Sequence, residues 1–211
     1  MGGSEPWLDD SHKGTMRVLI ACEFSGVVRE AFRAKGHDAW SCDLLPAEDN
    51  QRYHLQRDVF ECLDPVDPWD ALIQHWPCTL LCNSGVRWLY EGGIGGLRNE
   101  QRFADMEASA RNFRRLMDCG IPKIAGENPI PHKYAKAIMG DYSQTIQPWQ
   151  FGHGETKATC LWLKNLPALK PTNIVEGRTP RVHHASPGPD RWKERSRTLI
   201  GVAKAMSEQG G

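Results

Sequence analysis

The sequence predicts an α/β protein built on a mostly parallel sheet. Short apolar runs of strand length alternate with amphipathic helical segments, beginning with a strand at 18–22, a helix at 27–35 and a strand at 38–42. A strand, a crossover helix and a second strand in this order are typical of a parallel sheet with helices on both faces. The length of 211 residues fits one domain with a substantial core.

The first strand–helix–strand unit is predicted from three segments. Residues 18–22 form an apolar run short enough to be a buried strand. Residues 27–35 place apolar side chains on one helical face, and Gly36 is a suitable helix stop. Residues 38–42 form the second strand, which ends at Asp43.

The later elements are predicted from the same two periodicities. Apolar runs bounded by turn residues indicate strands, and a 3.6-residue apolar stripe indicates a long helix. In chain order we expect a strand at 69–75, a helix at 99–119, a strand at 121–125 running into Glu127, strands at 144–151 and 157–163, a loop rich in proline, glycine, arginine and histidine at 170–194, and a closing helix at 196–209.

Composition narrows the class of protein. Lysine plus arginine and aspartate plus glutamate number 26 each, so the zero net charge argues against coating nucleic acid by bulk charge. Seven cysteines without paired short spacings favour a reduced, cytoplasmic protein. We expect no membrane span, a flexible leader at 1–15 and a single domain at 16–211.

The turn after the first strand contains Phe24, Ser25 and Gly26. In an open α/β sheet this loop lies at the carboxyl end of the first strand, where cofactors bind, and Asp43 is well placed for ribose hydroxyls. Two interpretations stay open on these residues alone, a nucleotide-type cofactor site and a plain structural turn. Glu23, in the same loop, is either a contact for substrate or cofactor or a solvated loop carboxylate, and we favour the solvated carboxylate.

Cys78 follows Pro77 just after an expected strand. Free cysteines are most often buried hydrophobes, whereas a catalytic cysteine needs partial exposure and a lowered pKa. The turn at Pro77 favours exposure. A metal site with Cys82 and His75 is the third interpretation, but no C-x-x-C pair is present and the H-x-E pattern of zinc deaminases is missing, so we expect no metal.

Glu127 closes an apolar strand and is followed by Asn128 and Pro129. A carboxylate in that position is costly unless it is paired or catalytic. The alternative is a turn at Asn128 and Pro129 in which Glu127 caps a neighbouring element. A cysteine and a carboxylate together can carry out nucleophilic attack on C6 of a pyrimidine ring, and this favours the catalytic interpretation.

Taken together, the chain resembles a DNA cytosine-5 methyltransferase of the compact kind found in phages and prophages. The resemblance spans residues 16–209. It implies a Rossmann-like, S-adenosylmethionine-dependent methyltransferase fold whose target-recognition region is reduced or absent. The motifs that carry it are the F-x-G loop Phe24-Ser25-Gly26, the acidic residues Asp43 and Asp58, the nucleophile segment Trp76-Pro77-Cys78, the Glu127-Asn128-Pro129 segment, and a closing helix from Arg195 to Met206.

The resemblance also implies roles for individual residues. Cys78 would be the nucleophile, Glu127 would bind the ring, and Lys157 would stand in for the family's arginine. S-adenosylmethionine would lie against Phe24, Ser25, Gly26, Asp43, Asp58 and Pro77. The DNA, as a duplex with a flipped cytosine or as a single strand, would meet Asn128, Arg178, Arg181 and Arg191.

The chain departs from the family pattern in three places. Its glutamine–arginine motif is not clear, only about residues 165–194 are available for target recognition, and Trp76 replaces a proline beside the nucleophile. Two alternatives therefore stand beside the DNA enzyme. One is a methylase of a free pyrimidine nucleotide, and the other is a catalytically silent relative that binds nucleic acid or cofactor. The basic residues between 178 and 197 are either phosphate contacts or a solvated loop.

Overall fold

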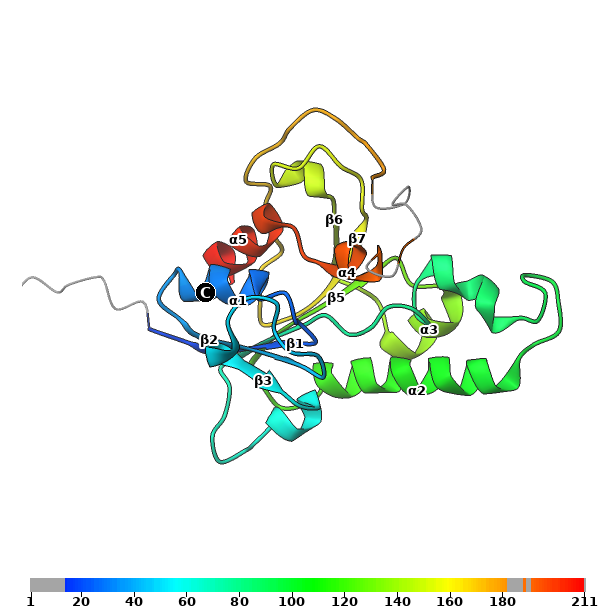
Figure 1. Ribbon diagram of the computed structural model, residues 1–211, viewed down its shortest axis with the longest axis horizontal. Helices are drawn as coiled ribbons and strands as arrows, with labels where there is room; N and C mark the ends of the chain where they lie inside the picture. The colour runs from blue at the N-terminus through cyan, green and yellow to red at the C-terminus, as the bar shows by residue number, and fades with distance from the viewer. Residues whose placement is uncertain (1–13, 182–187, 189–190, 211) are drawn as a thin grey trace, which may run out of the picture.

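A computed structural model describes residues 14–181, 188 and 191–210; thirteen of the fifteen residues of the expected leader lie outside this range. Its centre is a seven-stranded sheet in the order β3-β2-β1-β4-β5-β7-β6 (Figure 1). The first five strands are mutually parallel, whereas β7 is antiparallel to both β5 and β6. The α/β class and the mostly parallel sheet are thereby confirmed, and the arrangement is compatible with a Rossmann-like fold.

The strands are β1 Arg17–Ala21, β2 Asp38–Asp43, β3 His54–Gln56, β4 Ala71–Gln74, β5 Lys123–Pro129, β6 Gln144–Ile146 and β7 Thr159–Lys164. The helices are α1 Val27–Arg33, α2 Glu100–Met117, α3 Lys133–Met139, α4 Arg191–Ser196 and α5 Ile200–Gln209. Short 3₁₀ turns are η1 Gln51–Tyr53, η2 Val59–Cys62, η3 Asn83–Leu89 and η4 Pro148–Gln150.

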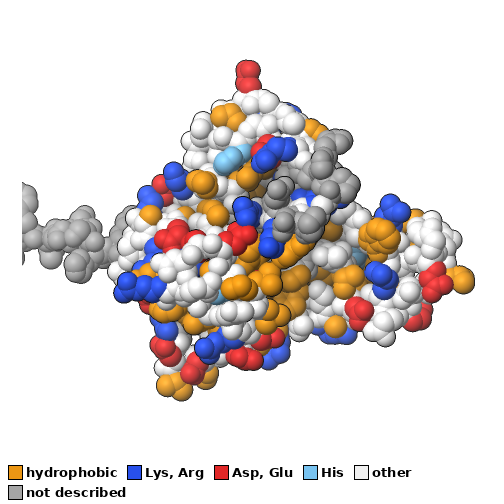
Figure 2. All heavy atoms as spheres, in the orientation of Figure 1, with side chains coloured by type: hydrophobic (Ala, Val, Ile, Leu, Met, Phe, Trp, Pro, Cys, Tyr) orange, Lys and Arg blue, Asp and Glu red, His pale blue; other side chains and the backbone are white. Residues whose placement is uncertain are grey.

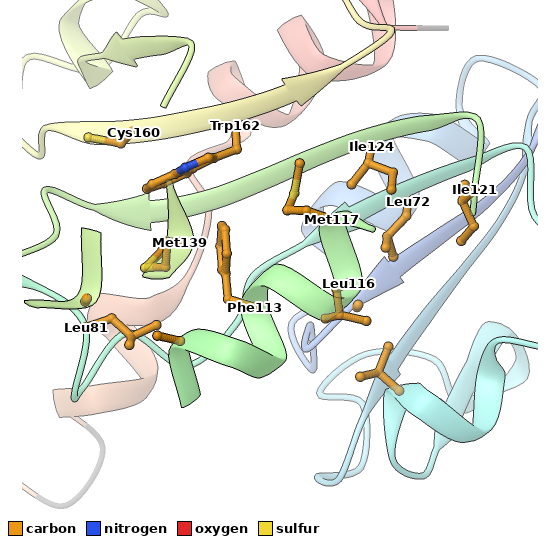
Figure 3. Packing of buried hydrophobic residues seen from close by; sticks show 14 of the residues in the cluster. Leu72, Leu81, Phe113, Leu116, Met117, Ile121, Ile124, Met139, Cys160 and Trp162 are labelled. Carbon is orange, nitrogen blue, oxygen red and sulfur yellow. The ribbon is translucent and has the colours of Figure 1, made fainter. Parts of the chain in front are cut away.

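Helices cover both faces of the sheet (Figure 1). α1 and α5 lie together on one face, where Phe32 and Val202 are buried in the same apolar cluster. α2 and α3 lie on the other face. Figure 3 shows how that second layer is filled: Phe113 of α2 points toward Trp162 of β7, with ring centroids 5.0 Å apart, and Met139 of α3 lies beside them.

Several predicted boundaries are wrong. The strand expected at 144–151 ends at Ile146, because Pro148, which has no N–H for the ladder, begins a 3₁₀ turn. The closing helix begins at Ile200 rather than at residue 196, and the end of the expected loop is the short helix α4. β3 and α3 were not predicted, since three and seven residues are too short to show a clear period.

Among the described residues, no helix is long and apolar enough to cross a membrane.

Arg29 of α1 is fully buried and joins the helix to the loop after β2. Its guanidinium donates to Ser41 Oγ at 2.9 Å and to Glu30 Oε1 at 2.9 Å, and it pairs with Asp49. Ser41 in turn contacts His54 Nδ1 at 2.9 Å. The network fixes the loop that leaves the carboxyl end of β2.

We expect Arg29→Met to lower the free energy of unfolding by about 2–3 kcal/mol, the scale of losing hydrogen bonds to charged groups. Urea denaturation measures the change. The matched control is Arg111→Met, which removes an exposed ion pair with Glu107 on α2 and should cost about 0.5 kcal/mol or less. Equal effects of the two substitutions would show that the Arg29 network does not stabilise the fold.

Candidate functional site

Loops from five strands meet at the carboxyl edge of the parallel sheet. In Figure 2 hydrophobic side chains are exposed in the middle of this face, between α4 above and α2 below, and lysine and arginine side chains gather near α4. Ligands of open α/β sheets bind at this edge.

The loop after β1 turns sharply. Cys22 has a φ of 58°, which is uncommon for a residue with a side chain, and Gly26 has a φ of 72°. The turn buries Glu23, which is only 5% exposed, so the expectation of a solvated carboxylate is wrong. Its oxygens accept hydrogen bonds from the backbone N–H groups of Val28, at 2.6 Å, and Arg29, at 3.2 Å. Glu23 therefore caps the beginning of α1, where the helix dipole favours a negative charge.

Two carboxylates lie near the end of β1. Asp43 ends β2 and accepts from the N–H of Leu45 at 2.9 Å, and burial raises its pKa. Asp58 follows β3, is exposed, and accepts from the N–H of Phe60 at 2.9 Å. Burial, Asp43 and Asp58 together raise the pKa of the Cys22 thiol to about 12. The parallel register of β1, β2 and β3 brings the ends of these three strands together, with Cys22 between the two carboxylates.

The segment before α5 crosses the loops after β1 and β2. The Trp192 ring of α4 lies 5.6 Å from that of Phe24. Arg197 donates to both oxygens of Glu48, at 2.7 and 2.6 Å. These contacts tie the predicted cofactor loop to the carboxyl-terminal part of the chain.

Cys78 follows β4 in a tight turn. Its carbonyl oxygen accepts from the N–H of Leu81 at 2.9 Å and from that of Cys82 at 3.1 Å. The thiol is half-buried, as a nucleophile would need, but a hydrogen bond with Cys82 and burial raise the pKa of Cys78. The hydrogen bond from Cys78, together with the hydroxyl of Ser84, lowers the pKa of Cys82. A raised pKa of Cys78 is opposite to the lowered pKa that a catalytic cysteine needs.

Trp76, which stands where the resembled family has proline, anchors this turn to the helix layer. Its indole N–H donates to Ser109 Oγ of α2 at 2.9 Å, and its ring lies 6.0 Å from that of Phe60. Pro77 is exposed beside it.

Glu127 lies inside β5, which continues through Pro129, so the alternative of a turn at Asn128 and Pro129 is wrong. The parallel register pairs Gln74 with Gly126, so His75 and Glu127, one residue further along each chain segment, lie side by side. His75 Nδ1 and Glu127 Oε2 are 2.6 Å apart, and both side chains are almost wholly buried. The sequence indicates His75 only as a candidate metal ligand. The matching positions of a histidine and a glutamate at two strand ends would have revealed the pair, had the register been known.

Lys157 lies before β7 and close to this pair. It lines a small hollow with Glu127, Thr198 and Leu199. Its Nζ donates to the carbonyl oxygen of Arg197 at 3.5 Å. Its positive charge helps to lower the pKa of Glu127, after the larger effects of burial, which raises it, and of His75, which lowers it.

Asn128 is buried, and its side-chain Nδ2 donates to the carbonyl oxygen of Pro129. Its Oδ1 has no hydrogen-bond partner among the described residues. Buried polar atoms are nearly always paired, so this acceptor is a candidate contact for a bound ligand.

Two of the three arginines predicted to contact nucleic acid are engaged within the chain. Arg178 stacks on Trp149, 4.0 Å from the ring centroid, and Arg181 pairs with Glu155 at 2.8 Å. Arg191 begins α4, and its Nε is buried without a partner in the described part of the chain. The histidines at 183 and 184 lie outside the described residues.

No group of three metal-ligating side chains that could hold an ion occurs among the described residues. The site therefore consists of two thiols, a buried histidine–glutamate pair and a lysine, flanked by a turn and two carboxylates at the ends of β1, β2 and β3. A comparison with protein-family models found no match, and a comparison with curated proteins found no matching relative.

Proposed function

We propose that the protein is a DNA cytosine-5 methyltransferase that uses S-adenosylmethionine and works in the cytoplasm of a bacterium or of a phage-infected cell. One observation carries the proposal: Cys78 lies in the turn that follows β4, and Glu127 lies in the adjacent parallel strand β5, close enough for its charge to act on the thiol. A thiol and a carboxylate so arranged are what addition to C6 of a cytosine ring requires.

The residues of the neighbouring loops fit the proposed cofactor. A glycine with positive φ begins α1, so the backbone at Gly26 has a conformation that side chains rarely adopt. Asp43, at the end of β2, still has acceptor capacity for ribose hydroxyls. When bound, the cofactor supplies an activated methyl group.

The chain's own residues then share the remaining chemistry. Cys78 is partly exposed, so its thiol can give up its proton to water before the sulfur adds to C6. Glu127 holds the ring at N3 and the exocyclic amine and stabilises the charge that develops there. Lys157 adds positive charge beside the same hollow. Once C5 carries the methyl group, loss of the C5 proton to water re-forms the C5–C6 double bond and expels the Cys78 sulfur.

A duplex hides C5 and C6, so the target base has to be flipped out or unpaired. Arg191 lies near this edge on α4 and is the described arginine best placed for a phosphate.

A methylase of free pyrimidine nucleotides is the second candidate. The ion pairs Arg181–Glu155 and Arg197–Glu48 favour it, because they occupy cations that a DNA enzyme would use on phosphates. Silent binding is disfavoured by the presence of both Cys78 and Glu127 in the site.

The test offers labelled S-adenosylmethionine with three acceptors: duplex DNA, single-stranded DNA and deoxycytidine monophosphate. Label in DNA cytosine, with binding that weakens steeply as salt rises, supports the DNA enzyme. Label only in the nucleotide selects the second candidate. Cofactor binding without any transfer would overturn both.

We expect Asp43→Ala to weaken S-adenosylmethionine binding by about 10- to 100-fold, the scale of losing one or two hydrogen bonds to a charged group. Calorimetric titration measures it. Asp38→Ala, at the opposite end of the same strand, is the control and should bind normally. Unchanged affinity in the Asp43 variant would mean that the cofactor does not use the end of β2.

A further inference from the structure

His75 is a buried imidazole with no role in the chemistry described so far. Its side chain is 10% exposed, and its backbone N–H continues the sheet by donating to Ala21 O at 2.9 Å. Nδ1 contacts Glu127 Oε2 at 2.6 Å, whereas Nε2 is buried with no partner among the described residues. The carboxylate of Glu127, which we propose to bind the substrate, therefore has a buried histidine ring as its hydrogen-bond partner.

Charged groups from three segments face the imidazole. Glu127 approaches from β5, Glu23 from the loop after β1, and Lys157 from the segment before β7. Burial lowers the pKa of His75, but the hydrogen bond and charge of Glu127, aided by Glu23, outweigh burial and Lys157, so the pKa is raised overall. The same hydrogen bond and charge lower the pKa of Glu127 against its burial. The resting pair is therefore an imidazolium beside a carboxylate.

We propose that His75 and Glu127 act as one proton-holding pair, in which His75 is a positioning residue that supplies the proton delivered by Glu127 to the base. The inference rests on the function proposed above. Glu127 Oε1 has no hydrogen-bond partner in the described structure and belongs to a residue that lines the hollow, so the carboxyl group can meet a ligand there.

The proton and electrons balance as follows. Addition of Cys78 forms the S–C6 bond and moves the electron pair of the C5–C6 double bond toward N3. The proton of His75 Nδ1 passes to the Glu127 carboxyl, whose terminal torsion is soft enough to turn it to the ring, and from there to N3. That electron pair is then used at C5 to bond the methyl group that the cofactor would supply. Loss of the C5 proton to water re-forms the C5–C6 double bond, the S–C6 bond breaks with its electrons returning to the Cys78 sulfur, and the N3 proton returns to the pair.

The pair gives a distinctive dependence on pH. Since the imidazolium supplies the proton, the rate should fall as pH rises through the raised pKa of His75. In His75→Gln the amide N–H can still donate a hydrogen bond to Glu127, but glutamine has no proton that it can release to the carboxylate. The rate of this variant should fall by about 100-fold or more, the lower end of the range for general acid–base catalysis. Its pH optimum should move to lower pH, because Glu127 itself must then be protonated.

The decisive experiment records ¹⁵N NMR spectra of the histidine rings of the full chain, with His75 assigned by its absence in His75→Gln. We expect both ring nitrogens of His75 to be protonated at pH 7, and the titration midpoint to fall in Glu127→Gln. A neutral His75 at pH 7 would overturn the inference. This readout needs no turnover, so it separates failure of the pair from failure of the proposed function.

The pH–rate profile completes the test. His37→Gln, at the amino edge of the sheet, is the control and should keep the wild-type profile. A wild-type profile in His75→Gln would also overturn the inference. If His75→Gln does not fold, the ¹⁵N titration of the wild type and of Glu127→Gln decides alone.

Discussion

We expect the largest effect from Cys78→Ala, which should abolish methyl transfer while S-adenosylmethionine still binds. The same substitution should abolish the covalent adduct between Cys78 and C6 that DNA containing 5-fluorocytosine traps, because fluorine at C5 cannot leave as a proton does. The thiol is the group proposed to bond C6, and no other side chain in the turn after β4 can replace it in the same geometry. Cofactor binding should survive because the loops after β1 and β2 do not depend on the Cys78 side chain. Denaturing gels of the adduct and calorimetry of the cofactor measure the two effects.

Cys119→Ala is the matched control for this experiment. Cys119 is also a half-buried free thiol, but it precedes β5 at the opposite edge of the sheet. The control should transfer methyl groups and form adduct as the wild type does. Transfer near the wild-type rate by Cys78→Ala would remove Cys78 as the nucleophile, and Cys82, its neighbour in the turn, would be tested next.

Glu127→Gln is expected to slow methyl transfer by roughly 100-fold or more, the scale of losing one preorganised stabilising group. Glutamine keeps the shape but neither the charge nor the proton, so the charge that develops on the ring is left without its partner. The substitution also removes the counter-ion of a buried imidazolium, so we expect a loss of stability of about 3–5 kcal/mol unless His75 becomes neutral.

The rate has to be measured below the unfolding temperature of the variant, with Glu107→Gln on the exposed face of α2 as control. The control should match the wild type in both rate and stability. An unchanged rate in Glu127→Gln would exclude Glu127 from the reaction and leave the His75 pair as a structural ion pair.

Much of the sheet was predictable because its strands are buried on both faces. β1, β2, β4 and β5 read as short apolar runs, and α2 shows a continuous apolar stripe, so hydrophobic periodicity was enough. β3 and α4 carry no such signal. α4 is a six-residue helix whose Trp192 packs on Phe24, a contact between residues far apart in the chain.

The site was predictable only in part, because single residues do not reveal their register. Cys78 and Glu127 were identified by the residues around them, but the partner of each came from the fold. The sequence indicates a solvated loop carboxylate at Glu23, but the positive φ of Cys22 directs this side chain beneath the first turn of α1, where it is buried. The thiol pair likewise depends on a turn that places Cys82 back against Cys78.

The reversed direction of β7 has a consequence for where reactive groups can be found in this fold. In a wholly parallel sheet, only the residues that follow a strand reach the carboxyl edge. β7 runs the other way, with Thr159 opposite Pro129 and Leu161 opposite Glu127, so the residues that precede it arrive at the same edge. Lys157 therefore approaches Glu127 from upstream of its strand, and a sheet edge built in this way brings together side chains from both ends of strands.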